Sequence, residues 1–145
     1  MGDFSIEIQP DNPNTSARDI LYQLLGEDNS RRTGRAEREG FAVLLRNTAT
    51  QALLGGLWAV DDCGWAFIDL LYVPERLQGQ GLGARMIAEA ETIASSRGMI
   101  GLWVNTYDFQ APGFYEKLGY SVFGRLEGDA EAAGQVFLRK RLRYP

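Results

Sequence analysis

The sequence contains no histidine and only one cysteine, Cys63. Without histidine the chain cannot build a Ser–His–Asp triad, a Cys–His pair or a histidine-ligated zinc site. A single cysteine cannot form a disulfide within the chain, which is typical of proteins in a reducing compartment. Cys63 lies among the turn residues of DDCGW, and we interpret it as part of a hairpin turn. Any acid–base chemistry must therefore come from Asp, Glu, Tyr, Lys or water.

Long apolar runs and an excess of positive charge are also lacking. No stretch approaches the ~18 apolar residues that cross a bilayer, and the first residues do not resemble a secretory signal. We therefore expect a cytoplasmic protein with no membrane partner. The net charge of −4 argues against a nucleic-acid partner. We interpret the basic run RKRLR at 139–143 as the solvated face of an edge strand rather than an RNA-binding patch.

The periodicity of the apolar residues predicts a single domain, residues 1–145, in which helices pack on a sheet. The polar, turn-rich stretch 28–40 is expected to be a mobile loop or a frayed helix. The order of elements predicts an α/β (α+β) fold with a mixed, largely antiparallel sheet of six to seven strands and helices on both faces. The expected strands are 4–8, 41–47, 52–60, 65–73, 99–105, 120–126 and 135–142, and the expected helices are 17–27, 82–98 and 111–119.

Three glycines at alternate positions, Gly79, Gly81 and Gly83, lead into the expected helix 82–98. Glycine destabilises a helix interior by roughly 1 kcal/mol relative to alanine, so their presence needs a reason. Either the backbone adopts a conformation that favours glycine, or a ligand approaches too closely for a Cβ. Exposed N–H groups at a helix N-terminus suit a pyrophosphate. A purely structural glycine-rich cap explains the glycines equally well.

Two nucleotide-binding motifs fit this stretch poorly. GQGLGA satisfies G-x-G-x-x-G/A, but VPERLQ separates the glycines from the preceding strand, whereas a Rossmann turn follows its strand almost directly. The acidic residue expected at the end of the next strand is missing, because that strand ends in Asn105. A P-loop is excluded because no Lys-Ser/Thr follows the last glycine.

The stretch VPERLQGQGLGA resembles the acyl-CoA signature Q/R-x-x-G-x-G/A of the GNAT N-acetyltransferases, matched by Gln78, Gly81 and Gly83. The preceding LLYV resembles the family's strand before this loop. FYEKLGY, residues 114–120, resembles the family's tyrosine-bearing helix. The two motifs are in register with each other as in the family. Together with the order of elements, they extend the resemblance over almost the whole chain.

The resemblance implies acetyl-CoA as co-substrate and no metal. The backbone of Leu71, Tyr72 and Val73 would pair with the pantetheine arm as an added strand. An amide near Leu71 would polarise the thioester carbonyl. The pyrophosphate would be held by the backbone amides of Gln78, Gly79, Gln80, Gly81, Leu82, Gly83 and Ala84.

The second motif implies that Tyr115 protonates the leaving thiolate. The family often has Asn seven residues before this tyrosine, where this chain has Asp108, and Asn105 is the candidate substitute for that pantetheine contact. Lys117 and Arg76 are candidates for contacting the 3′-phosphate, although each reads equally well as a solvated charge. The spacing of Tyr115 alone is also compatible with core packing.

Acyl transfer to an amine also needs a way to remove a proton. An alkylammonium has a pKa near ~10.4, so only about one molecule in 10³ is neutral at pH 7. Asp69, inside the apolar stretch WAFIDLLYV, is the candidate base, and we expect it to be buried. Alternatively, Asp69 pairs with an arginine or orients the substrate ammonium.

Two functions fit these observations. The first is an N-acetyltransferase that transfers acetyl from acetyl-CoA directly to an amine in a ternary complex. A small cationic amine is the expected acceptor, because residues 1–75 carry 12 acidic against 6 basic side chains. A protein N-terminus or a lysine side chain is the alternative acceptor. The second function is a non-catalytic acyl-CoA-binding module. Either is compatible with a homodimer.

Overall fold

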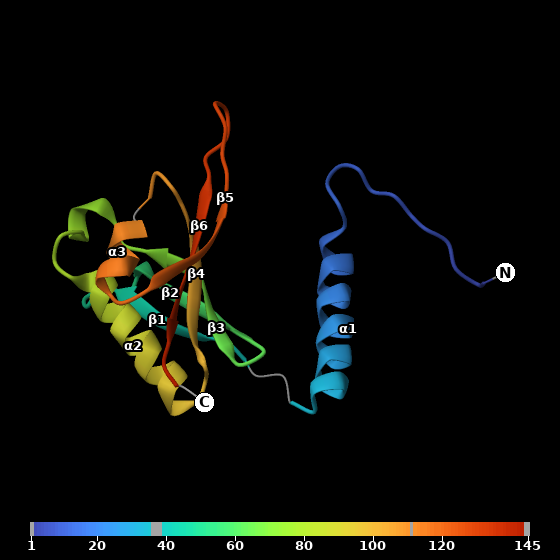
Figure 1. The fold of residues 1–145 in the computed structure, drawn as a ribbon, viewed down its shortest axis with the longest axis horizontal. Helices are drawn as coiled ribbons and strands as arrows, with labels where there is room; N and C mark the ends of the chain where they lie inside the picture. The colour runs from blue at the N-terminus through green and yellow to red at the C-terminus, as the bar shows by residue number, and fades with distance from the viewer. Residues whose placement is uncertain (1, 36–38, 111, 144–145) are drawn as a thin grey trace. The chain divides into compact units, whose positions relative to one another are not determined.

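The computed structural model describes residues 2–35, 39–110 and 112–143. The chain divides into two units, residues 1–38 and residues 39–145, and each is described by itself (Figure 1). In the described ranges, no helix is both long and apolar enough to pass through a membrane.

The first unit contains one helix, α1 (Thr15–Thr33). Its first turn is capped by Asn14, whose Oδ1 accepts a hydrogen bond from the Ser16 amide (2.9 Å). The helix ends where Gly34 adopts a left-handed conformation, φ 67°. It is longer than the expected 17–27: of the two alternatives expected for residues 28–40, a loop and a frayed helix, the helix holds up to residue 33. Residues 36–38 of that stretch lie outside the described residues.

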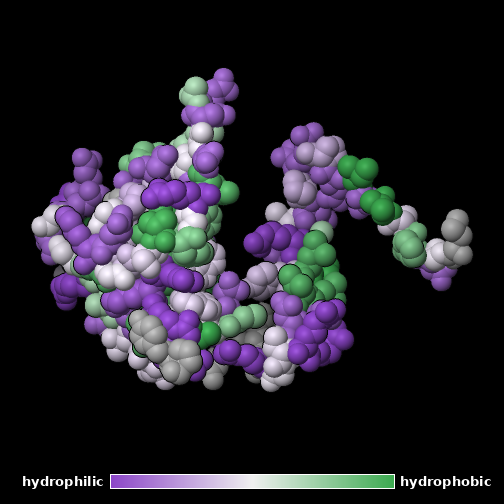
Figure 2. All heavy atoms as spheres, viewed as in Figure 1, coloured by the Kyte–Doolittle hydropathy of each residue, from purple (hydrophilic) through white to green (hydrophobic). Residues whose placement is uncertain are grey.

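Ion pairs explain why α1 continues through a polar stretch. Asp28 accepts from Arg31 (2.9 Å) and Arg32 (2.7 Å), which are three and four residues further along the same helix face. Figure 2 shows apolar side chains gathered on one side of this helix. Ile20, Leu21, Leu24 and Leu25 form that side, and all four are exposed in the structure.

The strand predicted over residues 4–8 is wrong, because these residues have no regular secondary structure. Phe4, Ile6 and Ile8 alternate as expected for a strand but are each more than 80% exposed. Alternation shows that one side of a segment is apolar, but a strand also needs a neighbour for its backbone N–H and C=O groups.

The second unit is built on one mixed sheet, in the order β1-β2-β3-β4-β6-β5. Neighbouring strands are antiparallel except β3 and β4, which are parallel. The predicted fold class is confirmed, with six strands in the described residues. Cys63 lies in the turn between β2 and β3, with φ 51°. The strands are β1 (Phe41–Arg46), β2 (Leu53–Asp62), β3 (Trp65–Tyr72), β4 (Gly101–Tyr107), β5 (Ser121–Leu126) and β6 (Gln135–Arg141).

Two helices of this unit pack against the sheet: α2 (Leu82–Ser96) and α3 (Pro112–Lys117). Both lie on the same side of it in Figure 1, so the predicted helices on both faces are not found among the described residues of this unit. The predicted α3 began at Ala111, which lies outside the described residues. A short 3₁₀ helix, η1 (Glu75–Leu77), precedes α2. Core residues from the sheet (Leu57, Ala59, Ile68, Leu102, Val104, Leu138) pack with Met86, Ile87, Ala90 and Ala94 of α2 and with Tyr115 of α3.

The basic run 139–143 differs from its interpretation. It begins in β6, which lies between β4 and β5 and is therefore not an edge strand. Lys140 points into the packed side of the unit and forms an ion pair with Glu91 of α2 (3.0 Å). Periodicity identified the strand correctly, but the position of a strand within a sheet depends on the whole topology.

Candidate active site

The parallel strands β3 and β4 separate after their first four paired residues. Their register runs from Trp65 opposite Gly101 to Ile68 opposite Val104 and then stops. On the other side of β3, Ala59 pairs with Ile68 and Trp58 with Leu70, so that Asp69 is an extra residue in the strand. Such a β-bulge redirects side chains and ends pairing, and bulges are common beside active sites.

A cleft of about 460 Å³ opens where the strands separate. Of the residues predicted for the site, it brings together Asp69, Leu71, Asn105 and Tyr115. The described residues that line it include one carboxylate and neither lysine nor arginine. The full lining consists of Phe67, Ile68, Asp69, Leu70, Leu71, Val104, Asn105, Thr106, Tyr107, Gln110, Tyr115 and Gln135.

Tyr115 belongs both to the core and to the cleft. Its side chain is 7% exposed and its ring meets those of Phe114 and Tyr120 edge-on, with ring centroids 5.0 and 5.9 Å away. Among the described residues its hydroxyl has no hydrogen-bond partner. Burial raises the pKa of Tyr115 to about 12, so the phenol keeps its proton throughout the neutral range.

Asp69 is exposed, so the predicted burial of this carboxylate is wrong. Strand alternation is the physical reason, because Asp69 follows the buried Ile68 and so lies on the opposite face of β3. The extra residue at the bulge then lets Leu71, rather than Leu70, pack against the core. The Asp69 carboxylate lines the cleft from which a substrate would approach.

The glycine loop has the geometry of an anion site. Gly79 and Gly81 have φ of 79° and 76°, which favour glycine, and a Cβ at either position would meet no atom within 4 Å. Gly81 precedes α2, and no side chain caps this helix start in the described part of the chain. The first amides of α2, those of Leu82, Gly83 and Ala84, therefore remain available, whereas Asn14 caps α1.

Gly83 has a different role from the other two glycines. It lies in the first turn of α2, and an added Cβ would come within 3.1 Å of the Phe114 ring. Its small size lets α2 pack closely against α3, the helix that carries Tyr115. The structural explanation therefore applies to Gly83, and the conformational one applies to Gly79 and Gly81.

Gln78 and the end of β3 shape the approach to this loop. The Gln78 side chain donates to the Val73 carbonyl (3.0 Å), which joins the loop to the strand end. Among the strands that the structure describes, Leu71 and Tyr72 pair with β2 alone, opposite Leu57 and Gly56. Their other backbone edge lies beyond the last β3–β4 pair, where an extended molecule can add as a strand.

Of the remaining candidate residues, Asn105 lines the cleft, and Asp108, Lys117 and Arg76 lie outside its lining. Asn105 donates from its side-chain amide to Gln135 Oε1 (2.9 Å) at the cleft. Asp108, at the position where the family often has Asn, accepts from the Gly134 amide (3.2 Å) and so fixes the loop before β6. Lys117 and Arg76 are exposed in α3 and η1, outside the cleft lining.

Sequence reasoning missed Gln110, which organises the turn after β4. Its Oε1 accepts from the buried Thr106 hydroxyl (2.9 Å) and from the Tyr107 amide (3.1 Å). In this turn the exposed rings of Tyr107 and Phe109 stack, 5.4 Å apart and nearly parallel. No spacing or motif singles out a lone glutamine in a turn, so the sequence carried no signal for it.

Comparison with known proteins decides the family. The model of the Acetyltransferase (GNAT) family matches residues 6–120. The chain belongs to this family. The acetyltransferase Atu2258 of Agrobacterium fabrum is 31% identical over 113 residues, which cover 78% of this chain and 82% of that protein. The predicted membership of the GNAT family is thereby confirmed.

Two further matches are informative about this GNAT protein. The crystal structure of a protein assigned as an acetyltransferase from Agrobacterium tumefaciens has a TM-score of 0.86 at 28% identity, covering 95% of this chain and all of that one. Blasticidin-S acetyltransferase of Streptomyces morookaense is 49% identical over 69 residues, 47% of this chain and about half (51%) of that protein. These matches identify the chain as an acetyl-CoA-dependent N-acetyltransferase.

Proposed function

We propose that this GNAT enzyme acetylates a small cationic primary amine by direct transfer from acetyl-CoA in a ternary complex. The observation that carries the proposal is the cleft between β3 and β4. It presents the Asp69 carboxylate and the Tyr115 phenol in one cavity whose described lining has no cationic side chain. A positively charged acceptor suits such a cavity. The half-length match to an enzyme named for blasticidin S supports a small-molecule acceptor.

Acetyl-CoA would bind from the glycine loop, along the end of β3, to the cleft. The open amides at the start of α2 suit its pyrophosphate, because the helix N-terminus carries partial positive charge. From Gln78 to Ala84, the backbone would supply these donors. The free edge of Leu71 to Val73 would pair with the pantetheine arm. Asn105 at the cleft would meet the same arm, and Lys117 would lie toward the 3′-phosphate.

Asp69 would receive the acceptor amine. Its exposed carboxylate attracts the ammonium form of the substrate and accepts its proton, directly or through a water molecule. Because Asp69 lines the cleft, the neutral amine would form beside the proposed binding edge for the pantetheine arm. An amide near Leu71 would stabilise the negative charge that develops on the thioester oxygen.

Tyr115 would act at the other end of the transfer. Its phenol is protonated in the neutral range because burial raises its pKa to about 12. Tyr115 lines the cleft, and its hydroxyl would donate its proton to the departing thiolate of coenzyme A. A thiol has a pKa near ~8.5 and leaves with modest help, so the contribution of Tyr115 is a rate effect rather than an absolute requirement.

Release of free thiol from acetyl-CoA tests the proposal with three acceptors of equal chain length: 1,4-diaminobutane, butylamine and 4-aminobutanoate. We expect kcat/KM to fall in that order, because Asp69 attracts a second positive charge and repels a carboxylate. Asp69→Asn should remove most of the preference. A preference for 4-aminobutanoate, or for a lysine peptide over every small amine, would contradict the proposed acceptor class.

A further inference from the structure

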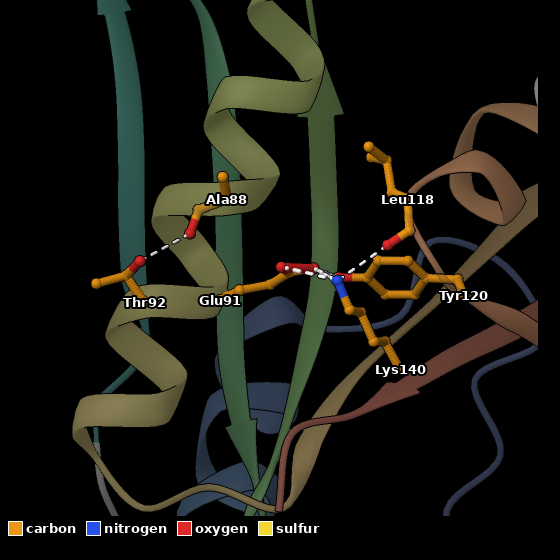
Figure 3. A network of polar contacts seen from close by, with 6 residues as sticks. All are labelled: Ala88, Glu91, Thr92, Leu118, Tyr120 and Lys140. Carbon is orange, nitrogen blue, oxygen red and sulfur yellow. Dashed lines mark hydrogen bonds and ion pairs between the residues drawn. The ribbon is translucent and has the colours of Figure 1, made fainter.

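Three polar side chains meet at the C-terminal end of α3, away from the cleft lining (Figure 3). Glu91 Oε1, on α2, accepts from the Tyr120 hydroxyl (3.1 Å) and from Lys140 Nζ of β6 (3.0 Å). Lys140 Nζ also donates to Glu91 Oε2 (3.1 Å) and to the Leu118 carbonyl (2.9 Å). We refer to Glu91, Tyr120 and Lys140 as the polar clamp.

The polar clamp is partly buried. The side chains of Glu91 and Lys140 are 18% and 31% exposed, and Tyr120 is 3% exposed. A charge pair at such a site is screened less by water than a surface pair, and its partners lose rotational freedom. The structure therefore holds Lys140 in one place, where its Nζ binds both a carboxylate and a backbone carbonyl.

The clamp acts on the segment that carries Tyr115. Lys140 binds the Leu118 carbonyl just after α3 ends, where a helix has unpaired carbonyls and partial negative charge. The amides of Leu118 and Tyr120 both donate to the Tyr115 carbonyl (3.0 and 3.1 Å). Lys140 and Glu91 are therefore each connected to the backbone of Tyr115 by two hydrogen bonds in series, Lys140 through Leu118 and Glu91 through Tyr120.

The length of α3 makes these contacts important. It has six residues, and a helix of this size is not stable through its own hydrogen bonds. Its position therefore depends on contacts with the rest of the unit. Glu91 belongs to α2, the helix whose N-terminus follows the glycine loop, so the clamp connects the two segments that carry the proposed site.

We propose that Glu91 and Lys140 are positioning residues for the transfer reaction: they fix α3 so that the Tyr115 hydroxyl faces the reacting thioester. The inference rests on the proposed role of Tyr115. Neither residue lines the cleft, so each acts through Tyr115 and contacts no substrate. A displacement of about 1 Å at a reacting group can cost up to about 10²-fold in rate, so a looser α3 should lower kcat.

The test is a double-mutant cycle that combines Lys140→Met with Tyr115→Phe. Lys140→Met keeps a long apolar stem but removes the charge and the three hydrogen bonds that Nζ donates to Glu91 and to the Leu118 carbonyl. We expect it to lower kcat about 10-fold, with the KM for acetyl-CoA changed less than about twofold. In a Tyr115→Phe background, Lys140→Met should lower kcat no further, because the group that it positions is already gone. Lys140→Arg, which keeps the charge and can reach both acceptors, should retain most of kcat.

The outcomes separate this inference from the proposed function. If Tyr115→Phe itself leaves kcat unchanged, the acid role of Tyr115 fails, and the positioning role fails with it. If Tyr115→Phe slows the reaction and Lys140→Met lowers kcat by the same factor in Tyr115→Phe as in wild type, only the positioning role is overturned. If Lys140→Met does not fold, Glu91→Gln replaces it in the double-mutant cycle with Tyr115→Phe, because it keeps the shape of the Glu91 side chain and removes its charge. Asp28→Asn, in the exposed ion pair of α1, is the matched control and should leave kcat unchanged.

Discussion

Two buried tyrosines at and just after helix α3 have different surroundings. Tyr115, on α3, lines the cleft, and Tyr120, three residues beyond the end of α3, belongs to the polar clamp; their rings are in edge-on contact. Burial is the largest cause that raises the pKa of both phenols. For Tyr120 the Glu91 carboxylate raises the pKa further, by its charge and by the hydrogen bond that it accepts. Burial thus keeps both protonated, but only Tyr115 has a hydroxyl free to donate to a substrate.

The largest expected difference between the two tyrosines is catalytic. Tyr115→Phe should lower kcat by about 10- to 100-fold, at the low end of general acid catalysis, because a thiolate is a good leaving group. Tyr120→Phe leaves the Lys140–Glu91 and Lys140–Leu118 contacts in place, so we expect a loss below about threefold. Steady-state kinetics at saturating acetyl-CoA measures both, and a larger loss in Tyr120→Phe would reverse the comparison.

Stability should show the opposite order. Tyr120→Phe removes a hydrogen bond to a carboxylate at a buried site, which should lower the free energy of unfolding by about 1.5–3 kcal/mol. The Tyr115 hydroxyl has no partner among the described residues, so Tyr115→Phe should change that free energy by less than about 0.5 kcal/mol. Urea unfolding of both variants measures this, and equal losses would show that the two hydroxyls have similar surroundings.

The pH dependence of the reaction sharpens the role of Tyr115. The reactive amine must be neutral, so kcat/KM for the amine should rise between pH 7 and 9, by nearly tenfold per pH unit. Because burial raises the pKa of Tyr115 to about 12, its deprotonation should produce no falling limb over that range. A kcat that falls above pH 8 in wild type but not in Tyr115→Phe would show that this phenol loses its proton much earlier.

The smallest expected effect is on stability at high pH. Both phenols have a pKa in the folded state above the ordinary value of 10.0, so their contribution to stability is complete below pH 10. It is lost as the pH rises above 10, because the unfolded chain releases these protons first. The urea concentration at the unfolding midpoint should therefore decrease as the pH is raised from 10 to 11. The fall should be smaller in Tyr120→Phe, and an equal fall would assign the effect to other groups.

Local sequence patterns predicted most of this unit. Apolar periodicity located six strands and α2, and the tyrosine motif pointed to Tyr115, which lines the cleft. Asp69 shows where such patterns stop: its bulge depends on the register with β2, which no single stretch records. Lys140 shows the same for charge, because its partner Glu91 lies 49 residues away. The strand expected at 4–8 failed for a related reason, since periodicity does not supply a pairing partner.

The claim on which the whole account depends is that the glycine loop binds acetyl-CoA. Calorimetric titration of wild type with acetyl-CoA, with NAD as the control ligand, tests it together with Gly81→Glu. Gly98→Glu is the matched variant, because Gly98 has a similar φ (68°) and equally open surroundings but lies just after the other end of α2.

We predict micromolar binding of acetyl-CoA by wild type and by Gly98→Glu, loss of that binding in folded Gly81→Glu, and no binding of NAD. Equal binding by the two glutamate variants, or no binding by folded wild type, would contradict the assignment of the glycine loop.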